Sequence, residues 1–415
     1  MKHYVIIGNS IAAVGAIEGI RQADREGKIT VISGEPCPAY GRPLISYWLW
    51  GKTNRAHMQY RPDDFYEKNG VQVLYGKIAC SIDPDKRQVL LKTGERVDYD
   101  ELLVATGSRP VVPPVEGLEQ VDKVFSFMTV EDAEELGKAL TPDSHVLIVG
   151  AGLIGLKCAE GIHERVADIT VVDMADQILP SVLDKEGSQR VQQYLEKNGW
   201  RFLLSDSVVS FEKNQAHLKS GRRVRFDVLV LAVGVRPNTE LVADAGGEVR
   251  RGIVADASGR TTLPRVYAAG DCCESYDITT GEHRVLALLP GAYRQGEAAG
   301  LAMAGKENPF TTAMPLNAVG FLNLHIVTAG SYNGEKHVMQ DGENYRCFFV
   351  QNGVLNGMIL IGDIRRSGIY TAMIRERTPL DTVDLEEIWR NPQLIAFSPE
   401  KRRAAFFGRK SNQLR

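Results

Sequence analysis

The chain has 415 residues, of which 44% are hydrophobic and 24% charged, and its formal net charge is −3. This composition is typical of a globular protein long enough for two or three domains. The nearly balanced charge gives no general attraction to nucleic acid or to anionic lipid, so we expect neither as a partner. An uninterrupted apolar stretch of about 20 residues is also missing, so the sequence predicts no transmembrane helix.

Cysteines and histidines are scattered along the chain. The six cysteines include no pair spaced as CxxC, which argues against a disulfide scaffold, a bound iron–sulfur cluster and a redox-active disulfide. We therefore expect a reducing, cytoplasmic compartment. The eight histidines show no metal-ligand spacing, so no metal site is predicted. The apolar run over 4–20 could be read as a signal sequence, but Gly8, Ser10 and Glu18 interrupt it.

The N-terminal pattern predicts a strand over 4–8, a helix over 11–25 and a strand over 29–33. An irregular loop rich in proline and aromatic residues is expected next, over 35–52, and short strands over 71–104. The turn after the first strand reads VIIGNSIAA, a loose form of the GxGxxG fingerprint of dinucleotide-binding folds. Its three key positions carry Gly8, Ser10 and Ala13. Because all three are small, a pyrophosphate can still approach the N-terminus of the helix.

The same order of elements restarts with a strand over 146–150, a helix over 153–166 and a strand over 169–173. Here VLIVGAGLIG carries the complete fingerprint, with glycines at 150, 152 and 155. An acidic residue follows each fingerprint at the expected distance, Glu35 in the first case and Asp173 in the second. The chain is therefore expected to hold two nucleotide cofactors.

Downstream segments complete this organisation. VYAAGD, over 266–271, is expected to return a strand to the first domain, with a helix over 291–304 after it. Alternating apolar strands over 316–330 and 345–362 indicate a separate C-terminal domain. We thus predict an α/β protein with two Rossmann-like three-layer nucleotide-binding domains and a C-terminal α+β interface domain. The predicted boundaries are 1–112 with 237–308 for the discontinuous first domain, 113–236 for the inserted second domain, and 309–415 for the third.

Five motifs occur in order over residues 1–305: the first fingerprint with Glu35, ATGSRP, the full fingerprint with Asp173, AVGVRP and AGD. In this the chain resembles the FAD-dependent pyridine nucleotide oxidoreductases related to rubredoxin, putidaredoxin and ferredoxin reductases, nitrite reductases and NADH oxidases. The C-terminal section matches that family more loosely. The resemblance implies that the first domain binds FAD and the inserted domain binds NAD(H).

The resemblance also implies an FAD site built from both segments of the first domain. Glu35 would bind the adenosine ribose, and Asp271 the ribitol or the pyrophosphate. Arg42 and Pro43 match the loop that runs over the pyrophosphate and the flavin ring. The other implied contacts follow the strands and turns of the motifs: Gly8, Ser10 and Ala13 at the pyrophosphate, Ile78 and Ala79 at the adenine, Thr106, Gly107 and Gly270 at the ends of strands, and Leu289 and Pro290 at the pyrimidine edge of the flavin.

The implied NAD site lies on the second fingerprint, at Gly150, Gly152, Ile154, Gly155, Asp173 and Gly234. Asp173 bears on the choice of cofactor, because a carboxylate accepts hydrogen bonds from ribose hydroxyls and repels a 2′-phosphate. No arginine or lysine occurs between Asp173 and Asp176 to offset that repulsion. The sequence therefore favours NADH over NADPH.

Two positions depart from the family pattern. Pro43 stands where relatives that reduce peroxide, oxygen or a disulfide carry a reactive cysteine, and Cys37 comes about six residues too early to replace it. Relatives also often pair a lysine in this loop with a glutamate after the second fingerprint, and these positions hold Tyr47 and Lys157. Our hypothesis is that Lys157 lies near the flavin–nicotinamide contact and favours the anionic reduced flavin. The alternative is an ordinary surface lysine.

Two further sequence features have competing interpretations. Cys272 and Cys273 follow Asp271 and could form a redox pair, but two buried thiols are the expected reading. The tail Lys401–Lys410 combines basic residues with two phenylalanines. It is either a frayed, solvated terminus or an element that docks an acidic partner.

Together these features predict an FAD-containing, NADH-dependent oxidoreductase. It would pass electrons between NAD(H) and an iron–sulfur protein, either a rubredoxin- or ferredoxin-like carrier or a cluster-bearing subunit of a larger enzyme such as an aldehyde or 2-oxoacid oxidoreductase. In a larger enzyme the electrons could flow toward NAD. The alternatives are an NADH oxidase that uses oxygen and an NADH-responsive binding flavoprotein. The sequence leaves open whether the chain is a monomer, a dimer or a subunit of a hetero-oligomer.

Overall fold

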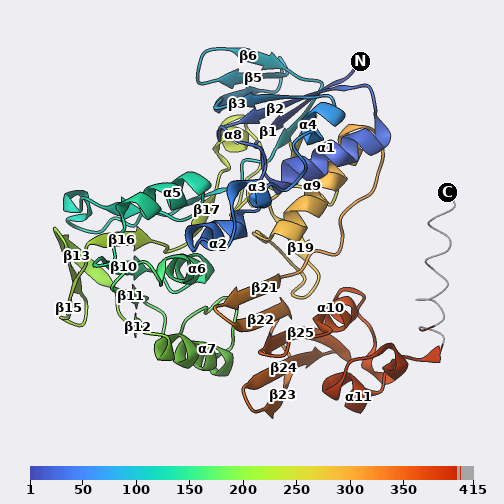
Figure 1. The fold of residues 1–415 in the computed structure, drawn as a ribbon. Helices are drawn as coiled ribbons and strands as arrows, with labels where there is room; N and C mark the ends of the chain where they lie inside the picture. Colours follow the sequence, from blue (N-terminus) through green and yellow to red (C-terminus); the bar gives the residue numbers. More distant parts are fainter. Residues whose placement is uncertain (400–401, 403–415) are drawn as a thin grey trace. The chain divides into compact units, whose positions relative to one another are not determined.

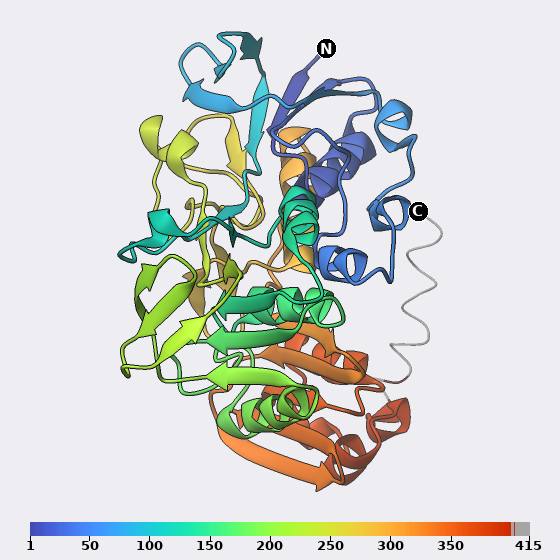
Figure 2. The ribbon, with the colours of Figure 1, turned by 60° about the vertical axis from the view of Figure 1, so that its left-hand side comes forward.

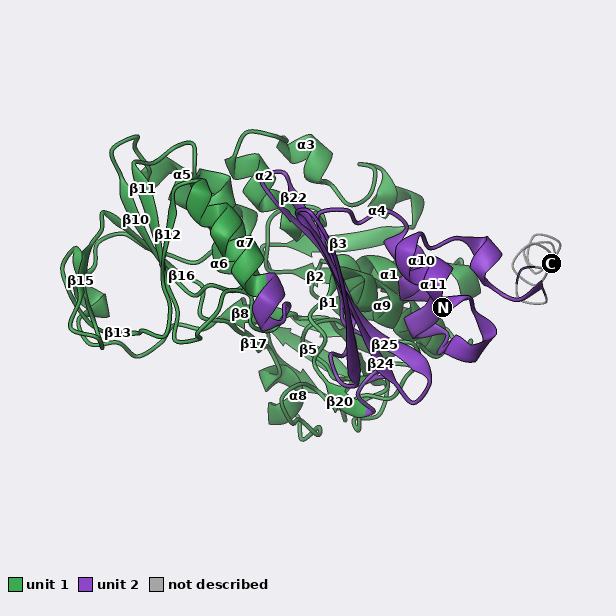
Figure 3. Ribbon diagram, turned by 90° about the horizontal axis from the view of Figure 1, so that it is seen from below, with its two compact units in different colours: residues 1–181, 188–276, 282–313 green, residues 182–187, 277–281, 314–415 purple. Residues whose placement is uncertain are grey.

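The computed structural model of the chain describes residues 1–399 and 402. This part divides into two compact units, which Figure 3 draws in different colours. Unit 1 comprises 1–181, 188–276 and 282–313, and unit 2 comprises 182–187, 277–281 and the described chain from 314 onward. Over the described residues, no helix has both the length and the apolar character needed to span a membrane. The tail Lys401–Lys410, except Arg402, lies outside the described residues.

The first half of unit 1 is built on a five-stranded parallel sheet with the order β18-β7-β1-β2-β3. Its strands are β1 (His3–Ile7), β2 (Lys28–Ser33), β3 (Val71–Tyr75), β7 (Glu101–Val104) and β18 (Val266–Ala268). As the AGD motif predicts, β18 arrives from far along the chain and pairs with β7. The helices are α1 (Ile11–Ala23), α9 (Leu289–Met303), α8 (Glu240–Asp244) and the short α2 (Ile45–Leu49), α3 (Arg55–Met58) and α4 (Phe65–Lys68).

Successive side chains of β1 point to opposite faces of the parallel sheet. Each face packs against another layer, so this half of the unit has two cores and three layers. Tyr4 and Ile6 pack with α1 and α9 on one face of the sheet. Val5 and Ile7 pack on the other face, against the antiparallel sheet of β4 (Ala79–Asp83), β5 (Gln88–Leu91) and β6 (Arg96–Asp98). Figures 1 and 2 show α1 (blue) and α9 (orange) side by side. Helices, parallel sheet and antiparallel sheet form the predicted three-layer arrangement.

The second half of unit 1 repeats this plan with the parallel order β12-β11-β10-β16-β9. These strands are β9 (Val124–Phe125), β10 (His145–Val149), β11 (Asp168–Val172), β12 (Trp200–Leu203) and β16 (Val228–Leu231). The helices are α5 (Val130–Ala139), α6 (Leu153–Ile162) and α7 (Lys185–Lys197), and the antiparallel layer is β13 (Val208–Glu212), β14 (Gln215–Leu218) and β15 (Arg223–Arg225). Leu147 of β10 packs against that antiparallel layer, while the alternate residue Ile148 faces α6.

A two-stranded antiparallel ribbon links the halves of unit 1. It pairs β8 (Ser108–Pro110) with β17 (Val235–Pro237), which are the ends of the ATGSRP and AVGVRP motifs. A second small ribbon pairs β19 (Ser275–Asp277) with β20 (Glu282–Arg284). The predicted domain boundaries, 1–112 with 237–308, 113–236 and 309–415, stay a prediction.

Unit 2 contains a five-stranded antiparallel sheet with the order β21-β22-β25-β24-β23. Its strands are β21 (Leu316–Phe321), β22 (Leu324–Gly330), β23 (Glu335–Asp341), β24 (Asn344–Gln351) and β25 (Val354–Ile361). The helices α10 (Ser367–Arg375) and α11 (Leu385–Arg390) contribute Tyr370, Ile374 and Ile388 to a core shared with Phe348 and Leu360 of the sheet.

Some elements differ from the sequence-based expectation. The helix α1 stops at Ala23 because the carboxylate of Asp24 accepts the backbone N–H groups of Glu26 and Gly27, at 2.9 and 2.8 Å. The loop expected to be irregular over 35–52 contains a 3-10 turn, Arg42–Leu44, that continues into α2. The edge strand β23 was not expected, because its mostly exposed sequence EKHVMQD gives no clear alternation.

Candidate functional site

The implied FAD residues gather at one edge of the first parallel sheet. Parallel strands end at the same edge, and the turns after β1, β2, β7 and β18 carry Gly8, Glu35, Thr106 and Asp271. Ile78, which the resemblance places at the adenine, lies near this edge too, since its exposed side chain approaches the position of a Cβ on Gly34, at 4.0 Å. Ligands of open α/β sheets bind at this carboxyl edge.

Two helix N-termini meet at the same edge. Ser10 precedes the first turn of α1, and Leu289 and Pro290 form the first turn of α9. The helices run in the same direction, because Ala12 lies against Gly296 and Ala16 against Gly300. The unpaired N–H groups and the positive dipole end of α1 therefore face this edge, which favours a pyrophosphate there, and Leu289 and Pro290 at the N-terminus of α9 lie at the same edge.

Gly8 and Gly270 bring the backbone close to these N-termini. A Cβ on Gly8 would lie 2.1 Å from the carbonyl oxygen of Ala105, and its φ of +106° also disfavours any other residue. A Cβ on Gly270 would approach Ala12 at 3.2 Å and Ala292 at 3.7 Å, in the first turns of the two helices. Ala13 is fully buried. The loose first fingerprint thus folds as a tight turn at the start of α1, although two of its glycines are replaced.

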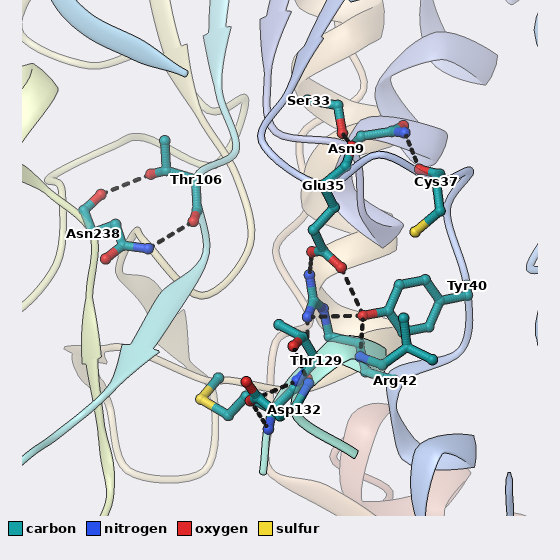
Figure 4. A network of polar contacts seen from close by, with 12 residues as sticks. Asn9, Ser33, Glu35, Cys37, Tyr40, Arg42, Thr106, Thr129, Asp132 and Asn238 are labelled. Atoms are coloured by element: carbon teal, nitrogen blue, oxygen red, sulfur yellow. Dashed lines mark hydrogen bonds and ion pairs between the residues drawn. The ribbon is translucent and has the colours of Figure 1, made fainter. Parts of the chain in front are cut away.

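Glu35 and Arg42 form the central ion pair of this edge. Figure 4 shows the Glu35 carboxylate facing both the Arg42 guanidinium and the Tyr40 hydroxyl, which donates to it at 2.7 Å. Arg42 also donates to the backbone carbonyl of Met128 at 3.1 Å, and the Tyr40 hydroxyl accepts the N–H of Val130 at 3.1 Å. Pro43 follows on the exposed face of the same 3-10 turn. Glu35 and the loop after β2 are thereby held in one fixed arrangement.

Asp271 completes the acidic part of the site. Burial raises the pKa of the Asp271 carboxyl, while Arg42 and a hydrogen bond with Ser108 act in the opposite direction. The adjoining Gly270 donates its N–H to the side-chain oxygen of Gln295 at 2.6 Å. Gln295 belongs to α9, so the Gly270–Asp271 turn is tied to the helix whose N-terminus faces it. No motif in the sequence marks Gln295 for this role.

Thr106 and Gly107 are held by a residue that sequence analysis missed. The Thr106 hydroxyl donates to the backbone carbonyl of Asn238 at 2.7 Å, and the Asn238 amide donates back to the carbonyl of Thr106 at 2.9 Å. The backbone N–H of Asn238 also donates to Gly107, at 2.9 Å. Figure 4 shows this reciprocal pair. Asn238 directly follows AVGVRP, so its place beside that motif was the available signal.

The second fingerprint forms an equivalent turn at the carboxyl edge of the second sheet. A Cβ on Gly150 would lie 2.2 Å from the carbonyl oxygen of Ala232, and one on Gly155 would lie 2.1 Å from that of Gly150. Gly152 caps α6, whose second residue is Ile154, and Gly234 follows β16 with a φ of +122°. All the implied NAD residues of this turn therefore lie together.

Asp173 is anchored to this second turn. One carboxylate oxygen accepts the N–H of Ala151, inside the fingerprint, at 2.6 Å, and the other accepts the N–H of Ala175 at 2.8 Å. The side chain is partly buried, while the neighbouring Met174 is exposed. This fixes a negative charge at the end of β11, where the ribose of a dinucleotide is expected.

Lys157 is not a solvated surface lysine. It lies on α6 with 15% of its side chain exposed and forms an ion pair with Glu160, whose side chain is 1% exposed. Its ammonium nitrogen also lies 4.2 Å from the centre of the Tyr47 ring, on α2. Lys157 therefore joins the helix that follows the second fingerprint to the segment that follows Arg42 and Pro43 in the first half of the unit.

The cysteines do not provide a reactive thiolate at the first sheet edge. Burial raises the pKa of Cys37 to about 11, with Glu35 adding to the effect. Cys272 and Cys273 are both buried free thiols, which confirms the expected reading, and burial raises the pKa of each. Among the described residues, no group of three or more histidine, cysteine or carboxylate side chains is arranged to hold a metal ion.

These features define a class of protein. The chain has two dinucleotide-binding edges on two parallel sheets of one compact unit, and a cation at the junction between the sheets. Such a pair of edges is the architecture of flavoproteins that exchange a hydride with a nicotinamide dinucleotide.

Comparison with known proteins identifies the family. The model of the pyridine nucleotide-disulphide oxidoreductases matches residues 2–296. The NADH-dependent phenylglyoxylate dehydrogenase subunit epsilon of Aromatoleum evansii is 30% identical, over 91% of this chain and 92% of the relative. The assimilatory nitrate reductase electron transfer subunit of Bacillus subtilis (strain 168) is also 30% identical over 91% of this chain, which spans 50% of that relative.

A solved structure agrees with this assignment. The covalent putidaredoxin reductase–putidaredoxin complex contains a chain that matches with a TM-score of 0.86 and 25% identity, over 94% of this chain and 98% of that one. The chain therefore belongs to the pyridine nucleotide-disulphide oxidoreductase family. It is an FAD-dependent NAD(P)H oxidoreductase, and its cofactors are FAD and NAD(H).

Proposed function

We propose that this chain passes electrons between NAD(H) and an iron–sulfur protein in the cytoplasm, and that it prefers NADH to NADPH. One observation carries the proposal. The loop over the first sheet edge has Pro43 where a reactive cysteine would act, and the nearby Cys37 thiol has a pKa of about 11. A thiol-based acceptor is therefore missing from this edge, and electrons must leave for an external partner.

The residues of the first edge would bind and orient FAD. The N-terminus of α1 would hold its pyrophosphate, with Gly8 and Gly270 allowing the close approach, and Leu289 and Pro290 at the N-terminus of α9 would contact the pyrimidine edge of the flavin. Glu35 would accept the ribose hydroxyls and Asp271 would contact the ribitol or the pyrophosphate. FAD supplies the conversion between two-electron hydride transfer and one-electron transfer.

The residues of the second edge would place the nicotinamide dinucleotide. Its pyrophosphate would approach the N-terminus of α6 beside Gly150 and Gly152. Asp173 already accepts two backbone N–H groups, which keeps its charge in place to bind ribose hydroxyls and to repel a 2′-phosphate. Lys157, between α6 and α2, would favour a negatively charged flavin by electrostatic attraction.

The names of the relatives support an external partner. Two are subunits of larger enzymes, and the solved complex joins a reductase to putidaredoxin. For this chain we propose a small iron–sulfur carrier or a cluster-bearing subunit, with flow in either direction. The basic tail Lys401–Lys410 remains a proposed docking element.

An anaerobic rapid-mixing experiment with the FAD-loaded protein tests the proposal. NADH should bleach the flavin at least about tenfold faster than NADPH, which corresponds to a difference of about 1.4 kcal/mol in activation free energy. The bleached protein should then be reoxidised quickly by a rubredoxin or a ferredoxin and slowly by oxygen. Faster reoxidation by oxygen would instead identify an oxidase, and slow bleaching by both nucleotides would identify a binding flavoprotein.

A further inference from the structure

A second concave surface lies at the opposite edge of the second sheet. Its cavity of about 770 Å³ opens where the strands begin. His145 starts β10, Asp168 starts β11, Arg201 lies at the start of β12, and Asp227 immediately precedes β16. The strands of this sheet have up to five residues, so about 13 to 17 Å of strand separates this groove from the fingerprint edge.

Four arginines line this groove: Arg201, Arg222, Arg223 and Arg225. All four are exposed, and among the described residues none of them forms an ion pair with a carboxylate. Arg223 and Arg225 are two apart on β15, so both side chains project from the same face of that strand. β15 also contacts β10, which brings these arginines toward the edge where Arg201 lies.

The two carboxylates of the groove are both hydrogen-bonded to His145, which also lines the groove. Asp227 accepts the backbone N–H of His145 at 2.8 Å, and Asp168 pairs with the His145 ring at 2.7 Å. This hydrogen bond with Asp168 raises the pKa of His145, so the ring carries more positive charge near neutral pH. The lining of the groove thus holds four guanidinium groups and one imidazole against two carboxylates, although the chain as a whole has a net charge of −3. The groove is a local concentration of positive charge.

We propose that this groove binds a small polyphosphate anion of the size of a nucleoside di- or triphosphate. Clustered like charges repel one another, and a multivalent anion would remove that cost. Guanidinium groups bind phosphate oxygens with paired hydrogen bonds. The volume falls in the range of ordinary small-molecule sites, and Leu203, Val224 and Phe226 provide an apolar part of the lining.

The shape of the groove favours a small anion over an acidic protein partner. Its lining is concave and comes from β12, β15 and the starts of neighbouring strands. An electron carrier would in addition need to approach the bound cofactors, and the second fingerprint lies at the opposite edge of this sheet. The proposal is therefore independent of the proposed electron-transfer function.

Isothermal titration of the FAD-loaded full chain tests this site. Tripolyphosphate and ATP would be titrated separately, with NAD+ at saturation so that the fingerprint of the second sheet is not available to them. We expect saturable binding of both with one site. An affinity for ATP above that for tripolyphosphate would show that the base is also recognised, and equal affinities would assign the binding to the phosphates alone.

The double variant Arg223→Ala/Arg225→Ala locates the binding. It should lower the affinity of the chain for both ligands about tenfold or more, since charge-assisted hydrogen bonds are lost. The matched control Arg25→Ala/Arg251→Ala removes the same charge from two exposed arginines outside the groove and should retain the affinity. Both variants should keep the wild-type rate of flavin reduction by NADH, which verifies that they are folded.

Three outcomes would overturn the proposal. One is the lack of saturable binding by the wild-type chain at millimolar ligand. Another is an equal loss of affinity in the groove and control variants, which would mean unspecific charge attraction. The third is tighter binding of a polyglutamate peptide than of tripolyphosphate at the same salt concentration, which would make the groove a docking surface for an acidic protein.

Discussion

Lys157 and Glu160 place a lysine–glutamate pair within a single helix, α6. A buried carboxylate such as Glu160 needs a partner, and the ammonium group of Lys157 supplies it. The same ammonium group lies over the Tyr47 ring, which restricts its position further. A cation held in this way has little freedom to move away from a developing negative charge, which is the condition for electrostatic preorganisation.

Replacing Lys157 with alanine should lower the reduction potential of the bound flavin by about 30 mV, which for two electrons is about 1.4 kcal/mol. Hydride transfer from NADH should slow by about tenfold, because the negative charge on the flavin loses its cation. The measurements are a redox titration and the rate of flavin bleaching in rapid mixing.

Two control variants test whether the effect of Lys157→Ala is specific. Lys138→Ala removes an exposed lysine from the last turn of α5 and should change neither quantity. Glu160→Gln removes the carboxylate but keeps the cation, so the potential should rise or stay unchanged. If Lys157→Ala and Glu160→Gln lowered stability alike while leaving the potential unchanged, Lys157 would have only a structural role.

At this scale the sequence revealed the positions that motifs mark, and little about what holds them. Glu35, Asp173 and Gly150 could be found because they stand at fixed distances in a recurring pattern. Tyr40 and Gln295 could not, because a tyrosine or glutamine side chain can reach many neighbours, and only the folded chain selects among them.

At the scale of elements, the contact between α1 and α9 sets how closely two helix N-termini converge. Gly296 and Gly300 on α9 meet the backbone of Ala12 and Ala16 on α1, and a Cβ on Gly296 would lie 1.9 Å from the carbonyl oxygen of Ala12. Residues without side chains therefore let the two backbones touch. This close approach fixes the position of the N-terminus of α1 relative to that of α9 at the sheet edge.

Gly296→Ala should destabilise the protein by about 1 to 3 kcal/mol, as overpacking of a tight core does. It should also weaken FAD binding, because separating the helices moves their N-termini apart. The control is Gly291→Ala in the same helix, where a Cβ would meet no atom within 4 Å. This control should be neutral or stabilising by up to about 1 kcal/mol, from helix propensity alone. Urea unfolding and FAD titration measure both effects, and equal stabilities of the two variants would contradict the argument.

Helices and strands could be predicted from the sequence where the pattern of apolar residues was clear. β1, β10 and β11 are apolar runs that lead into or out of fingerprint turns, and their bounds agree with the expected ones to within one residue. β23 was missed because an edge strand buries few of its side chains and so needs no apolar alternation. α2 was missed because its few residues follow a proline in a segment that resembles a loop.

At the scale of the whole molecule, both nucleotide edges lie in unit 1, although the chain that forms it is interrupted twice. The duplicated order of strand, turn and helix made this organisation predictable, since each copy closes its own parallel sheet. Unit 2 was predicted only as a separate α+β region, because an antiparallel sheet of ordinary strands has no motif that specifies its strand order. Its core of Phe348, Tyr370 and Ile388 is its own.

Removing FAD should therefore increase local unfolding more in unit 1 than in unit 2. FAD would bridge turns that follow β1, β2, β7 and β18, so it stabilises contacts between distant parts of the chain. A ligand whose free concentration is 100 times its dissociation constant adds about 2.7 kcal/mol to the free energy of unfolding of the protein that binds it. Hydrogen exchange followed by mass spectrometry should show faster exchange of the amides in β1, β18, α1 and α9 after FAD is removed. The amides of β24 and β25 in unit 2 should change little, because that sheet is supported by its own core.

Equal acceleration of exchange in both sets of amides would contradict this prediction, because it would mean that the two units open as one cooperative body. As a control, FAD is added back to the stripped protein. A return to slow exchange would exclude damage during the removal of FAD.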